Sequence, residues 1–191
     1  MSPARANLIV DGSFETPSVG SSWSIFANGQ VPGWTSNNNE IEIDYSPILG
    51  LPGAYDGTQS VELNGNTFDT ISQLVTGLTL NQTYRLTWAY AGRSGSCNEQ
   101  MNVLFGGAQV GQNTSDGDGA QAFADYSTFV TATATSETLS FAAINVGGSP
   151  GLGNELDAVT LTAVPEPGSL ALLVSAVTLI AGMGLVRGRQ T

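Results

Sequence analysis

Hydrophobic and polar residues alternate with a period of two along much of the chain before Pro165. In segment 83–91 the aromatic and aliphatic residues take every second position, and polar or small residues fill the positions between them. Side chains of a β-strand point alternately to its two faces, so this pattern predicts strands with one apolar face and one solvated face. An antiparallel sheet with one face on a core has this property. The same alternation recurs around Val61, Phe141 and Leu161.

Glycine and asparagine turns divide residues 7–163 into about ten short segments of this kind, and none of them carries a sustained helical stripe. This spacing of strands predicts an all-β fold, a β-sandwich or jelly roll. The predicted strands are Leu8–Val10, Trp23–Phe26, Ile41–Asp44, Gln59–Asn64, Thr70–Val75, Thr83–Ala91, Met101–Gly106, Ser127–Ala132, Thr138–Val146 and Leu156–Ala163.

Charge narrows the range of partners. The chain has 191 residues, 24 of them glycine, and a net charge of −11, and residues 7–163 hold fifteen acidic and only two basic side chains. A body this acidic repels nucleic acid and anionic lipid, so we expect it to bind neither.

Two residue types that often carry chemistry are scarce. The chain has no histidine, which removes the usual general base and imidazole zinc ligands. Cys97 is the single cysteine, so an internal disulfide is impossible, and its loop-like context without a basic neighbour predicts a passive thiol. These two observations disfavour histidine-based and thiol-based catalysis.

The C-terminal stretch differs from the rest of the chain. Leu170–Val186 is an uncharged apolar run of seventeen residues, which predicts a short transmembrane helix. Arg187 and Arg189 follow it, and basic residues directly after a span mark the cytoplasmic side. We expect the body outside and the tail inside. A buried core helix is the alternative, which an uncharged terminal run with basic residues only behind it disfavours.

Pro165, Glu166 and Pro167 stand directly before that run. Together with the apolar run and the two arginines, this motif resembles the PEP-CTERM sorting signal of Gram-negative bacteria. The resemblance covers residues 164–191. It implies recognition and processing by an exosortase, transient anchoring in the inner membrane, and delivery to the cell surface or extracellular matrix. A permanent membrane anchor remains the alternative.

The N-terminus shows one further export feature. Ala4-Arg5-Ala6 has the small-x-small form of a signal-peptide cleavage site, so residues 1–6 are expected to be its remnant, with the mature protein starting near Asn7.

Residues 7–163 carry a second resemblance, which lies in a set of short motifs in order along the chain. The body is similar to galactose-binding-like jelly rolls of carbohydrate-binding modules, and to plant cell-wall and bacterial surface domains of poorly defined role. The motifs are Asn7–Glu15, Val31–Trp34, Asp56–Leu63, Ile71–Gln73, Gly77-Leu78 with Tyr84–Leu86, and Leu156–Leu161.

The body resemblance implies a structural Ca²⁺ at the sandwich edge, where such folds bring the opening Phe-Glu turn and the closing aspartate together. The matching residues here are Glu15 and Asp157, with Asp56 in the segment expected to add carbonyl ligands. The closing strand of such modules often begins with two aspartates, whereas Ala158 takes the second place here. The alternative is that Glu15 and Asp157 are ordinary turn-capping acids.

Sugar binding without catalysis is the function that this resemblance implies, so we expect no enzyme activity. Aromatic rings stack on sugar faces and polar side chains bond the hydroxyl groups. The residues in loop-like or edge stretches that offer this chemistry are Trp23, Trp34, Tyr45, Tyr55 and Arg93. The ligand is expected to be an exopolysaccharide or a cell-wall glycan. A structural surface or biofilm component that binds no glycan is the alternative, and Trp34 could equally close one end of the sandwich.

Overall fold

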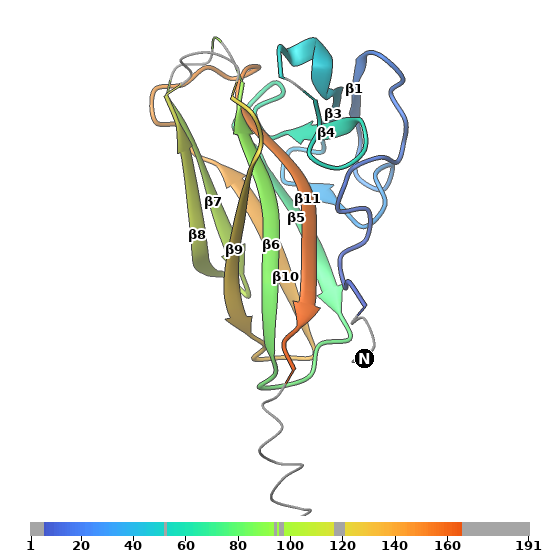
Figure 1. Ribbon diagram of the computed structural model, residues 1–191, viewed down its shortest axis with the longest axis vertical. Helices are drawn as coiled ribbons and strands as arrows, with labels where there is room; N and C mark the ends of the chain where they lie inside the picture. The colour runs from blue at the N-terminus through green and yellow to red at the C-terminus, as the bar shows by residue number, and fades with distance from the viewer. Residues whose placement is uncertain (1–5, 52, 94, 96–97, 117–120, 166–191) are drawn as a thin grey trace, which may run out of the picture.

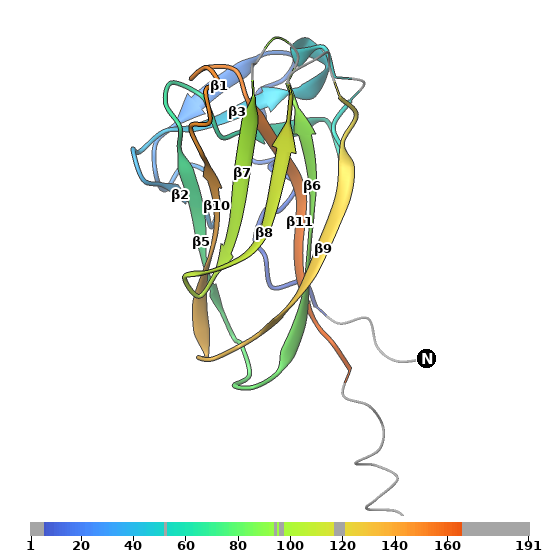
Figure 2. The ribbon, with the colours of Figure 1, turned by 90° about the vertical axis from the view of Figure 1, so that its left-hand side faces the viewer.

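Two antiparallel β-sheets pack face to face and form the protein (Figure 1; Figure 2). The computed structural model describes residues 6–51, 53–93, 95, 98–116 and 121–165. The six-stranded sheet runs in the order β1 (Trp23–Phe26), β3 (Ile41–Tyr45), β4 (Gln59–Glu62), β11 (Asn154–Ala163), β6 (Thr83–Gly92) and β9 (Ala124–Thr131). The five-stranded sheet runs in the order β2 (Thr35–Ser36), β5 (Thr70–Thr76), β10 (Ser136–Ala143), β7 (Glu99–Phe105) and β8 (Ala108–Ser115).

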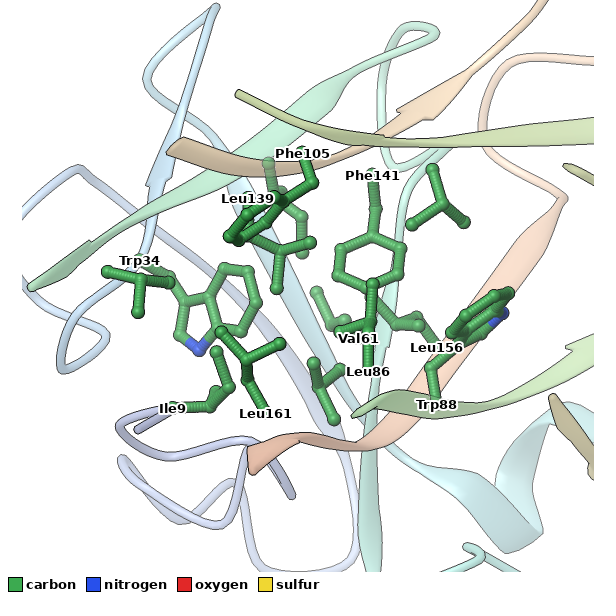
Figure 3. Close-up of a cluster of buried hydrophobic side chains, with 14 of the residues drawn as sticks. Ile9, Trp34, Val61, Leu86, Trp88, Phe105, Leu139, Phe141, Leu156 and Leu161 are labelled. Atoms are coloured by element: carbon green, nitrogen blue, oxygen red, sulfur yellow. The ribbon is translucent and has the colours of Figure 1, made fainter. Parts of the chain in front are cut away.

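The predicted alternation places the core between the two sheets. On β6, Tyr84, Leu86, Trp88 and Tyr90 are all at most 4 % exposed, and all four belong to the core between the sheets. Side chains from both sheets meet there, as Figure 3 shows for Leu86 and Leu156 from one sheet and Leu139 and Phe141 from the other. The all-β prediction is therefore confirmed.

Every predicted strand except Leu8–Val10 is present, with bounds that differ by a few residues. Leu8–Val10 is irregular, although the Leu8 amide donates a hydrogen bond to the Leu161 carbonyl oxygen (3.0 Å). Three elements were not predicted: β2, β8 and the 3₁₀ turn η1 (Ser46–Leu49). Strand β8 has the sequence AQVGQNTS, which is polar and carries a glycine, so alternation gives no signal for it.

The prediction of a solvated face is wrong for β4. Ser60 and Glu62, which point away from the core between the sheets, are 0 % and 2 % exposed. Segment 46–51, which begins with η1, lies over Ser60 on the outer face of the six-stranded sheet, and the Arg93 side chain pairs with Glu62 there. The Ser46 hydroxyl of this segment lies 2.9 Å from the Ser60 hydroxyl, and its Leu51 packs in a small second cluster with Ala91.

Strand β11 runs the length of the six-stranded sheet (Figure 1). Its start, Asn154, lies at the end where β4 and η1 are found, and its end, Ala163, lies at the opposite end of the sandwich. The Val164 amide donates to the Thr83 carbonyl oxygen (2.8 Å), and Pro165 after it is exposed.

None of the helices in the described part of the chain is long and apolar enough to cross a membrane. The predicted span 170–186 lies outside the described residues, as do Cys97 and four residues of the predicted sorting signal, Glu166, Pro167, Arg187 and Arg189.

Candidate functional site

A pocket of about 340 Å³ opens on the outer side of the six-stranded sheet, at the end where β1, β3 and β4 pair. We call it the Trp23 pocket, after the indole that lines its rim and is 53 % exposed. Apolar, acidic and basic side chains share the lining, which consists of Trp23, Ile25, Glu42, Asp44, Ile48, Gly65, Asn66, Arg93 and Gly151.

Strand register explains why acidic side chains gather there. Glu42 on β3 lies directly opposite Glu62 on β4, and Glu62 lies directly opposite Glu155 on β11. Asp44 is two residues after Glu42, so its side chain points to the same face of the sheet. We call Glu42, Asp44, Glu62 and Glu155 the acid cluster. Three of its members are at most 2 % exposed, and Glu42 is half-buried.

The polar contacts of the acid cluster are few. Arg93 donates to Glu62 Oε2 from its guanidinium at 2.6 Å, and the Glu62 side chain is fully buried in this ion pair. The Ser60 hydroxyl donates to Glu155 Oε2 at 2.7 Å. Asp44 Oδ2, Glu62 Oε1 and Glu155 Oε1 are buried without a hydrogen-bond partner among the described residues.

Burial and mutual repulsion shift the pKa values of these carboxyl groups upward. Burial, followed by the charge of Glu62, raises the pKa of Glu42 to about 7 and that of Asp44 to about 8. Burial also raises the pKa of Glu155 well above its ordinary value, and the charge of Asp44 adds to this. A low-dielectric site with several carboxylates and one guanidinium favours protons or a further cation.

Among the described residues, Glu42, Asp44 and Glu62 are the single group of three side chains whose metal-ligating atoms all lie within 4.8 Å of one another. Sequence reasoning missed this group. In the sequence these acids alternate with Ile43 and Val61, which is the pattern of a solvated sheet face, so no signal in the sequence separates them from ordinary surface acids.

The structure brings together two of the predicted sugar-binding residues and separates the others. Trp23 and Arg93 both line the Trp23 pocket although they are far apart in the sequence. Tyr55 is 47 % exposed and lines a different pocket of about 340 Å³ with Arg85 and Asp125. Tyr45, the last residue of β3, is half-buried.

Trp34 is a core residue, so the prediction that it contacts a sugar is wrong. It is 1 % exposed, and its ring centroid lies 5.1 Å from that of Phe14 and 6.2 Å from that of Phe141. Its indole N–H donates to the Asp11 carbonyl oxygen at 3.1 Å. Trp34 therefore takes the alternative role and fills the core near the N-terminal segment (Figure 3).

Glu15 and Asp157, predicted as calcium ligands, both hold the same loop through its backbone. Glu15 Oε1 accepts from the amides of Thr58 (2.7 Å) and Gln59 (2.8 Å). Asp157 Oδ2 accepts from the amides of Tyr55 (2.8 Å) and Asp56 (2.9 Å) in the same loop.

These amide contacts are those of turn-fixing acids. Asp56, the third predicted ligand, is exposed, and its amide is one of the two donors to Asp157. Burial raises the pKa of Asp157 to about 7 against the lowering effect of its amide donors. Because backbone N–H groups occupy acceptor positions of both carboxylates, the arrangement resembles a calcium site less than the acid cluster does. Calcium at these residues stays a prediction.

The chain matches no protein-family model and no curated protein sequence. Solved structures similar to it include a family 35 carbohydrate-binding module from Clostridium thermocellum, at 13 % identity and a TM-score of 0.46, covering 75 % of this chain and 99 % of that one. A family 61 module solved with β-1,4-galactotriose is similar at 14 % identity and a TM-score of 0.48, covering 83 % and 99 %. A xylan-binding family 22 domain from Paenibacillus barcinonensis is similar at 13 % identity and a TM-score of 0.48, covering 87 % and 100 %.

Proposed function

We propose that residues 7–163 are a non-catalytic glycan-binding domain and that the Trp23 pocket is its sugar site. The observation that carries the proposal is the half-exposed Trp23 indole at the rim of a pocket that also holds a guanidinium, carboxylates and the Asn66 amide. An aromatic face for the sugar ring, with fixed polar groups for its hydroxyls, is the combination that carbohydrate recognition needs.

Preorganisation supports this choice of pocket. Arg93 is fixed by its ion pair to the buried Glu62, so its guanidinium is already oriented before a ligand arrives. A rigid polar group loses less conformational entropy on binding than a free surface side chain does. Ile25 and Ile48 add apolar surface to the lining for the CH groups of a sugar.

Titration calorimetry on the full chain with β-1,4-galactotriose and xylan as first probes tests the proposal. Trp23→Ala should weaken binding about tenfold or more, equivalent to at least about 1.4 kcal/mol. Phe129→Ala is the matched control, since Phe129 is 65 % exposed on β9 and does not line the Trp23 pocket. Equal affinity in Trp23→Ala and wild type would overturn the assignment of the pocket.

A negative result across a wider glycan array, in buffer with and without Ca²⁺, would favour the alternative of a structural surface component that binds no glycan. Incubation of each probe with the protein, followed by analysis for shortened products, checks the non-catalytic part of the proposal.

We further propose that the protein is exported and that residues 164–191 are a sorting signal read by an exosortase in the inner membrane. The Pro165-Glu166-Pro167 motif, the apolar run 170–186 and the following Arg187 and Arg189 support this reading. Strand β11 ends at Ala163, and the proposed signal begins with the next residue.

Expression in a host that carries an exosortase tests the sorting proposal. Wild type should lose its tail and reach the surface or matrix, whereas Glu166→Ala should accumulate as unprocessed precursor in the inner membrane. The measurements are intact mass and cell fractionation. Surface-located wild-type protein that still carries residues 170–191 would favour the permanent anchor.

A further inference from the structure

The acid cluster carries more negative charge than the protein around it balances. Its four carboxylates lie on three neighbouring strands, with Glu42 opposite Glu62 and Glu62 opposite Glu155. Like charges directly opposite each other destabilise a sheet. Arg93 forms the ion pair with Glu62. A single guanidinium does not compensate this group, so the site requires additional positive charge or protons.

Buried carboxylate oxygens of the acid cluster have no hydrogen-bond partner among the described residues and could bind a cation. Asp44 is 1 % exposed, and its Oδ2 has no hydrogen-bond partner among the described residues. Glu62 Oε1 is also buried without a hydrogen-bond partner among the described residues, whereas Glu62 Oε2 pairs with Arg93. A buried carboxylate oxygen without a partner is costly, unlike an exposed acid that water solvates. These oxygens therefore distinguish the cluster from an ordinary acidic surface.

We propose that Glu42, Asp44 and Glu62 bind a divalent cation, Ca²⁺, at the floor of the Trp23 pocket. Calcium binds carboxylate oxygens at about 2.3–2.6 Å, so two ligands of one ion lie at most about 5 Å apart. The ligating atoms of the three residues lie within 4.8 Å of one another, which meets this requirement.

The pocket supplies what a site made of three carboxylates still lacks. Calcium takes six to eight oxygen ligands, and water completes the shell where protein groups do not. Glu42 and Asp44 line the pocket, so an ion beside them is reached from solvent and keeps room for water. Magnesium requires stricter octahedral geometry and gives up its water less readily, so the carboxylate-rich group favours Ca²⁺.

Charge balance agrees with one divalent ion. One Ca²⁺ and the Arg93 guanidinium together bring three positive charges to the four carboxylates of the acid cluster. They therefore offset most of the negative charge of the cluster. The inference concerns the pocket of the proposed function but is measured without any sugar, so either can fail while the other stands.

Terbium luminescence tests the site, because Tb³⁺ replaces Ca²⁺ in oxygen-ligand sites and an adjacent indole sensitises its emission. The full chain should show Trp-sensitised emission that Ca²⁺ displaces, and calorimetry should show Ca²⁺ binding directly. Asp44→Asn should weaken Ca²⁺ binding at least tenfold. Trp23→Phe should reduce the sensitised emission while the calorimetric Ca²⁺ affinity stays unchanged, which places the ion beside this indole.

Two controls keep the test decisive. Glu40→Gln removes one carboxylate near the pocket, where Glu40 accepts a hydrogen bond from Asn66, and should leave Ca²⁺ affinity unchanged. If Asp44→Asn does not fold, Glu42→Gln takes its place, since Glu42 is half-buried.

Two results would overturn the inference. The first is wild-type protein that binds no Ca²⁺ by calorimetry. The second is Ca²⁺ binding that survives Asp44→Asn and is lost in Asp157→Asn, which would instead locate the ion at the sandwich edge.

Discussion

Replacement of Trp34 by alanine should unfold the protein far more easily, whereas replacement of Trp23 should not. Trp34 is 1 % exposed and packs against Phe14 and Phe141, while Trp23 is 53 % exposed on a pocket rim. The two tryptophans occur in similar glycine- and serine-rich surroundings in the sequence, so the comparison separates a core role from a surface role.

The magnitude follows from burial and from one hydrogen bond. Removal of a buried tryptophan side chain costs about 3–5 kcal/mol because both transfer free energy and a cavity contribute. The Asp11 carbonyl oxygen also loses the indole N–H donor at 3.1 Å, which adds about 1 kcal/mol. We expect Trp34→Ala to lower the free energy of unfolding by about 4–6 kcal/mol, and Trp23→Ala by about 1 kcal/mol or less.

Thermal and urea denaturation followed by circular dichroism measure both changes without relying on tryptophan fluorescence. At this chain length 1 kcal/mol corresponds to about 2–4 °C, so Trp34→Ala should lower Tm by roughly 8–24 °C. Trp34→Phe keeps much of the ring contact and loses the N–H donor, so its Tm should lie between those of wild type and Trp34→Ala. A Trp34→Ala protein within 1 kcal/mol of wild type would refute the core assignment.

Three further predictions test other parts of the structure. Gly12→Ala should destabilise the fold by about 1–3 kcal/mol in denaturation, because its Cβ would overlap the backbone carbonyl oxygen of Val159 and a rigid backbone cannot yield; an unchanged midpoint would contradict this. Asp157→Asn should speed hydrogen exchange at the amides of Tyr55 and Asp56, which donate to its Oδ2, and unchanged exchange there would remove the loop-fixing role. In chelator, the free energy of unfolding should fall as pH rises from about 5 to about 8. The pKa values of Glu42 and Asp44 are raised in the folded state to about 7 and about 8, so the native state binds more protons than the unfolded state in this window. A flat or rising stability profile would contradict it.

Alternation was a reliable guide wherever a strand has one face on the central core. The aromatic face of β6 follows from it directly. It failed where polar residues are buried by another part of the chain. Glu62 and Ser60 have the sequence pattern of a solvated face, but Ser46 and Arg93, which are distant in the sequence, contact them, and no local pattern reports such contacts.

The candidate site was predicted only in part, because its residues come together through long-range strand pairing. Trp23 and Arg93 were both chosen for their chemistry, and strand pairing brings them to one pocket. The acidic residues between them were not chosen, since their importance comes from cross-strand register. The turn Pro32-Gly33 before Trp34 is compatible with both a sugar contact and a buried position for this residue, and only the structure shows that the chain folds inward after the turn.

Strand β11 separates the two ends of the domain. It begins beside the acid cluster and ends at Ala163, and ten residues of strand span about 33 Å. A tether attached at Val164 would therefore hold the molecule by the end farthest from the Trp23 pocket (Figure 1). Attached in this way, each copy would stand on its base and offer its pocket to long polymers in the surrounding medium. The tether would then lie away from the mouth of the pocket.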